Sequence, residues 1–287
     1  MFKRILVPTD GSALASGILG PLTPFLHQEN PTLVLLRVLE PKHYDGPTEQ
    51  KQQEADAKER MGRLSELLEG EGCSVEFKVE FGDPVARILH HAKSADLLAM
   101  STHARTGVAR WFHGSVTETV LRDVKTPVLV SNPSGLGPHQ RFRNLLITVP
   151  DEPAAAKALG EFAATLAVQQ GAKATLLRIG SWEGDWALDA SPAGANPDAL
   201  PLLPSALDLK QQAQVAAAPL KAAKVATEVR IGWGKPADGI LGLATELGCD
   251  LVVLGTHGYH GLERLMYGSV SEAVVRHAKC PALVAHL

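Results

Sequence analysis

The chain has few cysteines, few aromatic residues and no excess of charge of one sign, and each shortage excludes a class of protein. Its 287 residues include three cysteines, which are widely spaced and form no CxxC pair. That spacing predicts neither a disulfide framework nor a zinc site, and we interpret the cysteines as small buried hydrophobic residues. The net charge is −3. We therefore expect no nucleic-acid partner, because the composition supplies no basic surface.

Long apolar runs and catalytic signatures are also absent. The N-terminus MFKRILVPTDGS turns polar after a few apolar residues, and no run approaches the ~20 residues of a membrane span. We therefore expect a cytoplasmic protein with no membrane partner. The sequence contains no GxxxxGK[ST] loop, no G-x-G-x-x-G after the first predicted strand, no G-x-S-x-G and no HExxH. No catalytic residue and no metal ligand is predicted.

What the sequence does contain is an internal repeat, at a constant offset of 154 residues. The best-matched stretches are STHARTGVARWFHGSV, residues 101–116, and GTHGYHGLERLMYGSV, residues 255–270. Asp96 and Asp250, which precede the two stretches, keep the same offset. The chain therefore consists of two copies of one structural plan.

Each copy alternates short apolar strands with helical stretches. In copy one the strands KRILVP, TLVLLRVL, VEFKVEF, LLAM and PVLV alternate with predicted helices, the first over residues 13–28. Copy two repeats this with NLLITV, ATLLRI, TEVRI, LVVL and ALVAHL. The pattern predicts an α/β fold of two tandem Rossmann-like domains, each a five-stranded parallel sheet with helices on both faces. The strand order 3-2-1-4-5 is assumed.

The domain boundaries follow the composition. We place domain one at residues 1–135, a linker rich in Pro and Gly at 136–143, and domain two at 144–287. Copy two also carries an insertion at residues 181–204, which predicts an irregular surface loop or, alternatively, a lid that closes on a ligand.

The glycine-rich stretches follow the fourth strand of each copy, at the sheet edge where ligands bind in such folds. With strands one and four as neighbours, Asp10 is expected near His103. Gly268 and Ser269 open a helix whose free N–H groups favour phosphate. An alternative reading of Ser269, and of Ser115 in copy one, is a capping box closed by a glutamate three residues later.

The basic residues of these stretches have two readings each. Arg110 and Arg264 are placed where a guanidinium could reach a phosphate, but solvated loop arginines are equally compatible with the sequence. For His103 and His257 we favour packing within the turn over acid–base catalysis, because no carboxylate partner is evident in the sequence.

The chain resembles the universal stress protein family, in particular its tandem-domain members. Gly255, Gly258, Gly268 and Ser269 match the G-x2-G-x9-G-[ST] pattern of the nucleotide-binding members, and ILVPTDGS, the G-D-P at residues 82–84 and PVLV support the match. The resemblance implies an adenine nucleotide alpha hydrolase-like fold. It also implies binding of ATP, ADP or AMP, with Mg²⁺ as an optional companion, and a role in stress response by nucleotide-linked sensing or signalling.

The resemblance also implies two sets of nucleotide-binding residues, with adenine beside Val38 or Ile179 and phosphate on the glycine-rich stretches. In copy two the set is Ile179, Gly255, Thr256, His257, Gly258, Arg264, Gly268, Ser269, Val270 and Ser271. In copy one it is Pro8, Asp10, Val38, Ser101, His103, Ala104, Arg105, Arg110, Gly114, Ser115, Val116 and Thr117.

Each copy departs from the family pattern in a different place. Copy one keeps Asp10 but has Ser101 and Ala104 where the pattern has glycines. Copy two keeps the glycines but has Pro150 at the position of the aspartate, with Asp151 one residue late. We hypothesise one occupied site per chain, in copy two.

Three functions and one contact are left as expectations. The leading one is a nucleotide-binding stress protein without dedicated catalysis; the alternatives are a slow ATPase or nucleotidyl-transfer enzyme, and an interaction module with vestigial pockets. In the family the fifth strands commonly pair, so residues 127–130 and 281–285 are expected to join the two halves, and homodimer formation is a further alternative.

Overall fold

The computed structural model describes residues 1–12, 17–43, 46–70, 73–101, 116–131, 141–180, 205–256 and 269–286. Within these ranges, no helix is both long enough and apolar enough to cross a membrane. The insertion at 181–204 and the linker at 136–140 lie outside the described residues.

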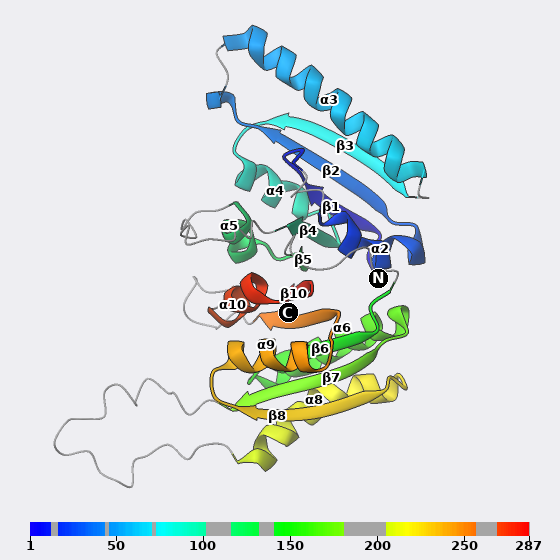
Figure 1. The fold of residues 1–287 in the computed structure, drawn as a ribbon, viewed down its shortest axis with the longest axis vertical. Coiled ribbons are helices and arrows are strands. Elements are labelled where there is room, and N and C mark those ends of the chain that lie inside the picture. The colour runs from blue at the N-terminus through cyan, green and yellow to red at the C-terminus, as the bar shows by residue number, and fades with distance from the viewer. Residues whose placement is uncertain are drawn as a thin grey trace, which may run out of the picture.

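The first half alternates strands and helices as the sequence predicts (Figure 1). Its elements are β1 (Arg4–Pro8), α2 (Leu19–Glu29), β2 (Thr32–Leu39), the 3-10 turn η1 (Pro41–His43), α3 (Gly46–Gly70), β3 (Ser74–Phe81), α4 (Pro84–Ala92), β4 (Leu97–Ser101), α5 (Val116–Asp123) and β5 (Val128–Ser131). The sequence predicts a helix over residues 13–28. In the described residues the first helix begins at Leu19, after a turn at residues 17 and 18, and residues 13–16 lie outside the described ranges.

The second half repeats the plan. Its elements are β6 (Asn144–Thr148), α6 (Pro153–Gln170), β7 (Lys173–Gly180), α8 (Ala206–Ala222), β8 (Thr227–Trp233), α9 (Pro236–Glu246), β9 (Leu251–Thr256), α10 (Ser269–His277) and β10 (Ala282–His286).

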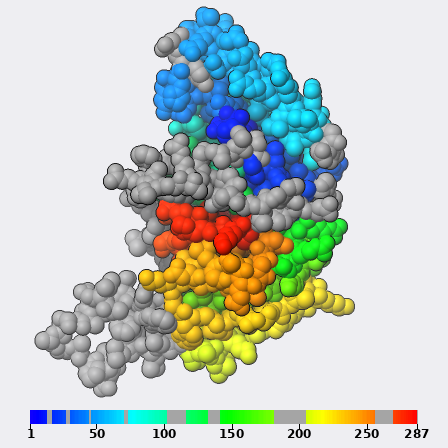
Figure 2. Space-filling model, in the orientation of Figure 1, coloured from blue at the N-terminus to red at the C-terminus, as the bar shows by residue number. Residues whose placement is uncertain are grey.

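All ten strands form one sheet in the order β3-β2-β1-β4-β5-β10-β9-β6-β7-β8. Each half therefore has the assumed order 3-2-1-4-5, with its own strands parallel. The halves join where β5 runs antiparallel to β10, with Leu129 opposite Leu283. The expected pairing of the fifth strands is confirmed, and in the space-filling view the last residues of the chain, in red, fill the middle of the molecule (Figure 2).

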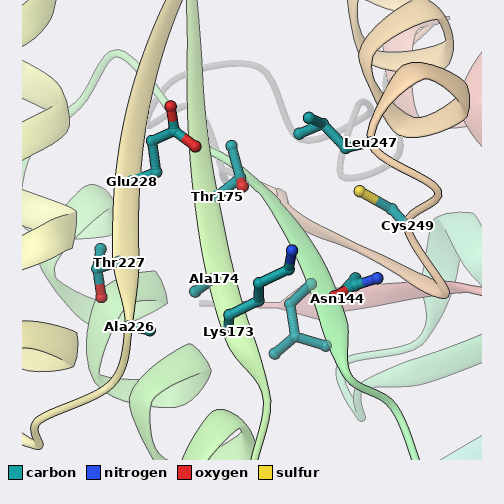
Figure 3. A pocket seen from close by; sticks show the side chains of 10 residues that line it. Asn144, Lys173, Ala174, Thr175, Ala226, Thr227, Glu228, Leu247 and Cys249 are labelled. Carbon is teal, nitrogen blue, oxygen red and sulfur yellow. The ribbon is translucent and has the colours of Figure 1, made fainter.

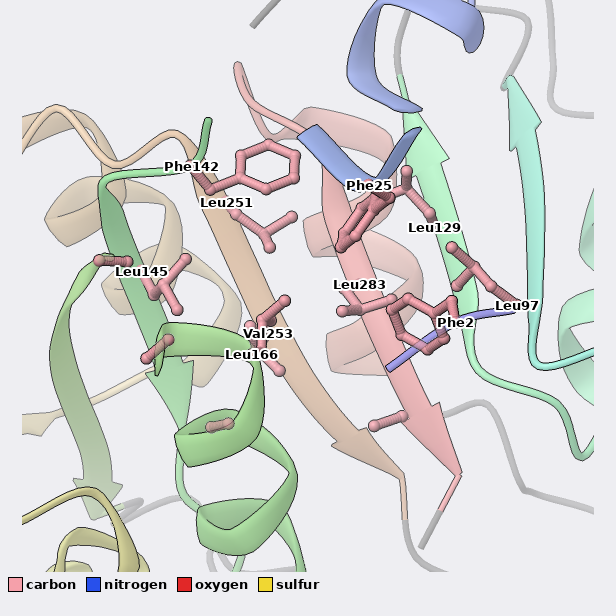
Figure 4. Packing of buried hydrophobic residues seen from close by; sticks show 14 of the residues in the cluster. Phe2, Phe25, Leu97, Leu129, Phe142, Leu145, Leu166, Leu251, Val253 and Leu283 are labelled. Carbon is pink, nitrogen blue, oxygen red and sulfur yellow. The ribbon is translucent and has the colours of Figure 1, made fainter. Parts of the chain in front are cut away.

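The antiparallel junction makes the strands of the two halves run in opposite directions, so the carboxyl ends of their strands lie on opposite sides of the sheet. Figure 4 shows β5 running opposite to β10 and β9 at the centre of the sheet. At the junction, the carboxyl ends of β4 and β9 therefore leave the sheet at opposite edges.

Two apolar cores, one on each face, hold the helices to the sheet. One face packs under α2, α3, α6 and α8, the other under α4, α5, α9 and α10. Neighbouring strand residues point to different faces, so Ile5 and Val7 enter the first core and Leu6 the second. The three cysteines are buried and form no disulfide bond, as interpreted from the sequence.

The first core crosses the boundary between the halves. The ring of Phe25 lies 5.4 Å from that of Phe2 and 5.5 Å from that of Phe142, and Phe2 is 6.4 Å from Phe162. Figure 4 shows this packing across β10. Because the aromatic residues come from both copies, the halves share a core as well as a sheet.

The repeated aspartates Asp96 and Asp250 accept backbone hydrogen bonds at the start of the first strand of each half. The Asp96 carboxylate accepts hydrogen bonds from the backbone N–H groups of Lys3 and Arg4 at 2.8 and 2.9 Å. Asp250 does the same for Arg143 and Asn144 at 2.7 and 3.0 Å. The repeat of these two residues is explained by structure, since they satisfy backbone donors at the sheet edge away from the candidate site.

Candidate functional site

The candidate site of copy one lies where β1 ends. β1 pairs with both β2 and β4, so the turn after Pro8 and the end of β4 leave the sheet side by side. The Thr9 N–H donates to the Leu36 carbonyl at 2.9 Å, which holds the chain on β2 for one residue beyond the strand. This is the switch point at which ligands bind in open parallel sheets.

The turn that carries Asp10 is folded by its own side chains. The Asp10 carboxylate accepts from the Ser12 N–H at 2.8 Å, and the Thr9 hydroxyl accepts from the Gly11 N–H at 3.0 Å. Gly11 has φ of 79°, a conformation that favours glycine. Asp10 is thereby held in an exposed position at the carboxyl edge.

Two further residues of the predicted set reach the same edge. Val38 is half-buried near the end of β2, opposite Glu80 of β3. Ser101 ends β4, and its hydroxyl oxygen is buried without a hydrogen-bond partner in the described part of the chain. A buried hydroxyl of this kind is a donor and acceptor held ready for a polar ligand atom. The structure therefore brings Pro8, Asp10, Val38 and Ser101 to one edge.

The corresponding turn of copy two is built differently. The Val149 N–H donates to the Leu177 carbonyl at 2.8 Å, which repeats the bond of Thr9. Pro150 then takes the place of Asp10, and the Asp151 carboxylate is paired with the guanidinium of Arg178. The one-residue delay of the aspartate thus changes its partner, from a backbone amide of its own turn to an arginine of β7.

Arg178 is the functional-edge residue that the sequence analysis missed. Only 9% of it is exposed, and besides Asp151 it donates from Nε to the Gln212 side chain at 3.0 Å and from one terminal nitrogen to the Ile179 carbonyl at 2.6 Å. Burial lowers the pKa of Arg178, but an arginine stays charged at physiological pH. The signal in the sequence was a single charged residue inside the apolar strand ATLLRIG.

This arginine occupies the predicted adenine end of copy two. Ile179 was expected to contact adenine through its backbone, and its carbonyl oxygen already accepts a charge-assisted hydrogen bond. In copy one the residue at the same strand position, Arg37, is only half-buried. The two copies therefore differ in the burial of the arginine beside the predicted adenine end.

The helices that follow the glycine-rich stretches begin close to where the sequence predicts. α10 starts at Ser269, which is exposed, followed by half-buried Val270 and buried Ser271. Ser269 is the first helical residue, and the Glu272 carboxylate accepts from the Arg276 guanidinium at 2.9 Å. Gly268, which precedes the helix, lies outside the described residues, so the capping box of Ser269 and Glu272 stays a prediction.

The remaining predicted residues divide into two groups. Gly255 pairs with Ala285 and Thr256 with His286 at the end of β9, while Val116 is exposed and Thr117 half-buried at the start of α5. The rest of the predicted set lies outside the described residues: His103, Ala104, Arg105, Arg110, Gly114, Ser115, His257, Gly258, Arg264 and Gly268.

Metal-ligating side chains do not cluster in the described ranges, where no group of three or more His, Cys, Asp or Glu could hold an ion. Mg²⁺ commonly binds through one or two carboxylates together with substrate phosphates and water.

Comparison with known proteins gives one consistent family. The model of the universal stress protein family matches twice, over residues 1–132 and 141–286. A putative universal stress protein of Staphylococcus haemolyticus is 52% identical over 58 residues, which are 20% of this chain and 35% of the relative. One from Methanocaldococcus jannaschii is 49% identical over 51 residues, 18% of this chain and 30% of the relative. The alignments thus span about a third of the length of these curated relatives.

Solved structures match over the full length. A universal stress protein from Archaeoglobus fulgidus covers 99% of this chain and 96% of its own, with a TM-score of 0.75 and 23% identity. A putative universal stress protein from Pseudomonas aeruginosa covers 99% of this chain and 93% of its own, with a TM-score of 0.67 and 16% identity. At these identities the likeness establishes a shared two-copy fold.

Proposed function

Because this chain belongs to the universal stress protein family, with one copy of the family domain in each half, we propose that it binds an adenine nucleotide at the carboxyl edges of its sheet. Nucleotide occupancy would act in stress response by sensing or signalling. The observation that carries the proposal is the switch point itself, where β1 lies between β2 and β4 and brings Asp10, Val38 and Ser101 to one edge.

In copy one the described groups suit the adenosine end of a nucleotide. Asp10 is exposed and accepts hydrogen bonds, and Ser101 offers a buried hydroxyl that lacks a partner in the described ranges. A nucleoside presents amine and hydroxyl groups, which are the chemical complement of these side chains. Copy one lacks the two glycines of the pattern, so we assign it the weaker hold on phosphate.

In copy two the phosphate end fits a nucleotide better than the adenine end does. The sequence keeps the glycines of the phosphate-binding pattern, and α10 begins directly after Gly268, so its first N–H groups are oriented toward an anion on that edge. Adenine would enter only if Arg178 released the Ile179 carbonyl. We therefore propose that occupancy of copy two is coupled to opening of the Arg178–Asp151 pair.

The role of Mg²⁺ in this proposal is limited to the phosphates. Bound there, the ion would neutralise charge on the β- and γ-phosphate oxygens. The chain's own groups position the nucleotide, and no catalytic step is assigned to them.

Calorimetric titration with ATP, with and without Mg²⁺, tests the proposal and gives the stoichiometry. Saturable binding is expected, weakened by Asp10→Ala for copy one and by Gly258→Ala for copy two. Asp123→Ala removes an exposed carboxylate at the far end of α5 and serves as the matched control. Absence of saturable binding by ATP, ADP and AMP would overturn the proposal, and mass spectrometry of ligand retained after gentle purification gives an independent reading.

A further inference from the structure

A cavity of about 300 Å³ opens at the amino end of the strands in copy two, away from the proposed nucleotide site. It lies on the face covered by α9, which ends at Glu246 before it covers the first residues of β6, β7 and β8. Figure 3 shows the side chains that surround it, among them Asn144, Lys173, Thr175, Glu228, Leu247 and Cys249. Its size is at the lower limit of small-molecule sites.

In copy one an arginine fills the same place. Arg4 of β1 reaches over β2 to Glu76 of β3, with N–O distances of 3.2 and 2.7 Å from its two terminal nitrogens to the two carboxylate oxygens. The residue of β2 beneath this ion pair is Val34, which lies opposite Glu76 in the sheet register.

Copy two keeps the carboxylate and loses the arginine. By strand register Asn144 takes the position of Arg4, Thr175 that of Val34, and Glu228 that of Glu76. Asn144 is too short to reach β8, and its amide donates to the Gly248 carbonyl at 3.3 Å. The cavity is therefore the space that a guanidinium and its stem occupy in the other half of the chain.

In copy two the Glu228 carboxylate pairs instead with an arginine of its own strand, β8. Glu228 contacts Arg230 Nε at 2.7 Å through Oε1, and about half of each side chain remains exposed. A single exposed pair of this kind is weak and exchanges readily with other partners. Glu228 is thus an accessible anion on the β8 wall of the cavity.

A positive group lies in the same cavity. Lys173 stands where copy one has Thr32, and its amine is directed into the space between Glu228 and Cys249 (Figure 3). Burial raises the pKa of the Cys249 thiol to about 11, Asp250 adds to that rise, and the nearby Lys173 ammonium opposes it. The Asp250 carboxylate already accepts the two backbone bonds at the start of β6, so Glu228 and Lys173 are the charges that face the cavity.

We propose that this cavity binds a small zwitterion that carries a guanidinium and a carboxylate. The guanidinium takes the place that the Arg4 side chain has in copy one and bonds to Glu228, while the carboxylate meets Lys173. The Thr175 hydroxyl, on a side chain only 8% exposed, forms the floor beneath the two charges. Because Glu228 and Lys173 are exposed, the expected dissociation constant is on the order of 1 mM.

Calorimetry or ligand-observed NMR on the full chain with three probes tests the chemistry. Arginine carries both groups, citrulline replaces the guanidinium with a neutral urea of the same shape, and agmatine lacks the carboxylate. Arginine is expected to bind, with citrulline about tenfold weaker and agmatine intermediate. Agmatine also stands for an arginine side chain on a partner protein, so binding of agmatine as tight as that of arginine would overturn the zwitterion assignment.

Two variants and one control tie the binding to this cavity. Glu228→Gln is expected to weaken arginine binding about tenfold, and Asn144→Arg to abolish it by refilling the cavity as in copy one. Glu76→Gln is the matched control and is expected to leave binding unchanged, because Arg4 already covers that carboxylate. Circular dichroism and the unfolding midpoint verify that each variant folds. Equal binding of arginine and citrulline, no saturable binding of arginine, or equal effects of Glu228→Gln and Glu76→Gln would overturn the proposal.

Discussion

The side-chain amide of Gln170, at the end of α6, donates a hydrogen bond of 3.1 Å to the carbonyl oxygen of Pro24 in α2, across the boundary between the two halves. The oxygen of the same amide accepts from the Phe142 N–H at 3.2 Å. Gln170 is only 1% exposed. A buried amide with hydrogen bonds to both halves fixes their relative position, because its loss would leave a buried backbone group on each side without this partner.

Replacement of that amide should destabilise the whole chain. Gln170→Leu leaves the Pro24 carbonyl and the Phe142 N–H without this partner, and we expect a loss of about 1–3 kcal/mol in the free energy of unfolding. Urea unfolding followed by circular dichroism measures it. Gln211→Leu, at an exposed position on α8, is the control and should change stability by less than about 0.5 kcal/mol. Equal effects of the two variants would show that the cross-boundary bonds contribute nothing.

Two helical glycines should respond in opposite directions to alanine. In α6 a Cβ on Gly160 would lie 2.3 Å from the Ala216 carbonyl oxygen of α8, so Gly160→Ala must push the helices apart. In α9 a Cβ on Gly242 would meet nothing within 4 Å. We expect Gly160→Ala to destabilise by about 1–3 kcal/mol and Gly242→Ala to stabilise by about 0.5–1 kcal/mol. Thermal unfolding of both variants checks the signs, and a stabilising Gly160→Ala would contradict the close packing of α6 on α8.

Shortening Arg178 should change nucleotide binding in copy two. Arg178→Met removes the bond to the Ile179 carbonyl and the pair with Asp151, so the adenine end opens. In ATP titrations we expect about tenfold tighter binding at the copy-two site. In the wild-type chain adenine must break the charge-assisted hydrogen bond of Arg178, which costs about 1.5 kcal/mol, and the variant avoids this cost.

The comparison variant for that experiment is Arg37→Met, the same substitution at the equivalent strand position of copy one. It should leave affinity at copy two unchanged. If Arg178→Met also leaves ATP affinity unchanged while the wild-type chain binds ATP, the arginine does not restrict the adenine end, although nucleotide binding itself stands.

Acid should destabilise the protein through His286. Burial lowers the pKa of His286 to about 4, below its ordinary value of 6.5. The unfolded chain therefore binds more protons than the folded one between these values, so the free energy of unfolding falls as pH drops from 6.5 to 4. The full contribution, on the order of 3 kcal/mol, is present above pH 6.5.

Replacing this histidine separates its contribution from that of other groups. His286→Leu cannot titrate, so the slope of unfolding free energy against pH should become smaller between pH 4 and 6.5. His43→Leu, at an exposed histidine, is the control and should keep the wild-type slope. An unchanged slope in His286→Leu would contradict a depressed pKa.

The sequence predicted the fold well because its signals are local and repeated. The ten strands follow apolar runs such as LVVL, and the repeat placed each run in the same order in both halves. The helix predicted over residues 13–28 does not run unbroken, since residues 17 and 18 form a turn; glycine and proline near the start of α2 favour a turn that apolar periodicity does not reveal.

Parts of the candidate site could not be read from the sequence. Asp151 was noted as one residue late, but its partner Arg178 comes from another strand, and only the folded sheet brings the two together. The cavity beside Glu228 depends on a side chain that is missing, the arginine that copy one has at position 4. A sequence pattern marks residues that are present, whereas an empty space depends on the three-dimensional neighbours of a short residue.

The antiparallel junction of β5 and β10 gives the chain the symmetry of a dimer within one polypeptide. In a dimer of identical chains every substitution appears twice, so a change that favours one site is imposed on the other. Here the two halves are encoded separately. One half carries Asp10 and Arg4, while the other carries the Arg178–Asp151 pair and has no arginine over Glu228. Covalent linkage thus permits the two proposed nucleotide sites to differ from each other while they share one sheet.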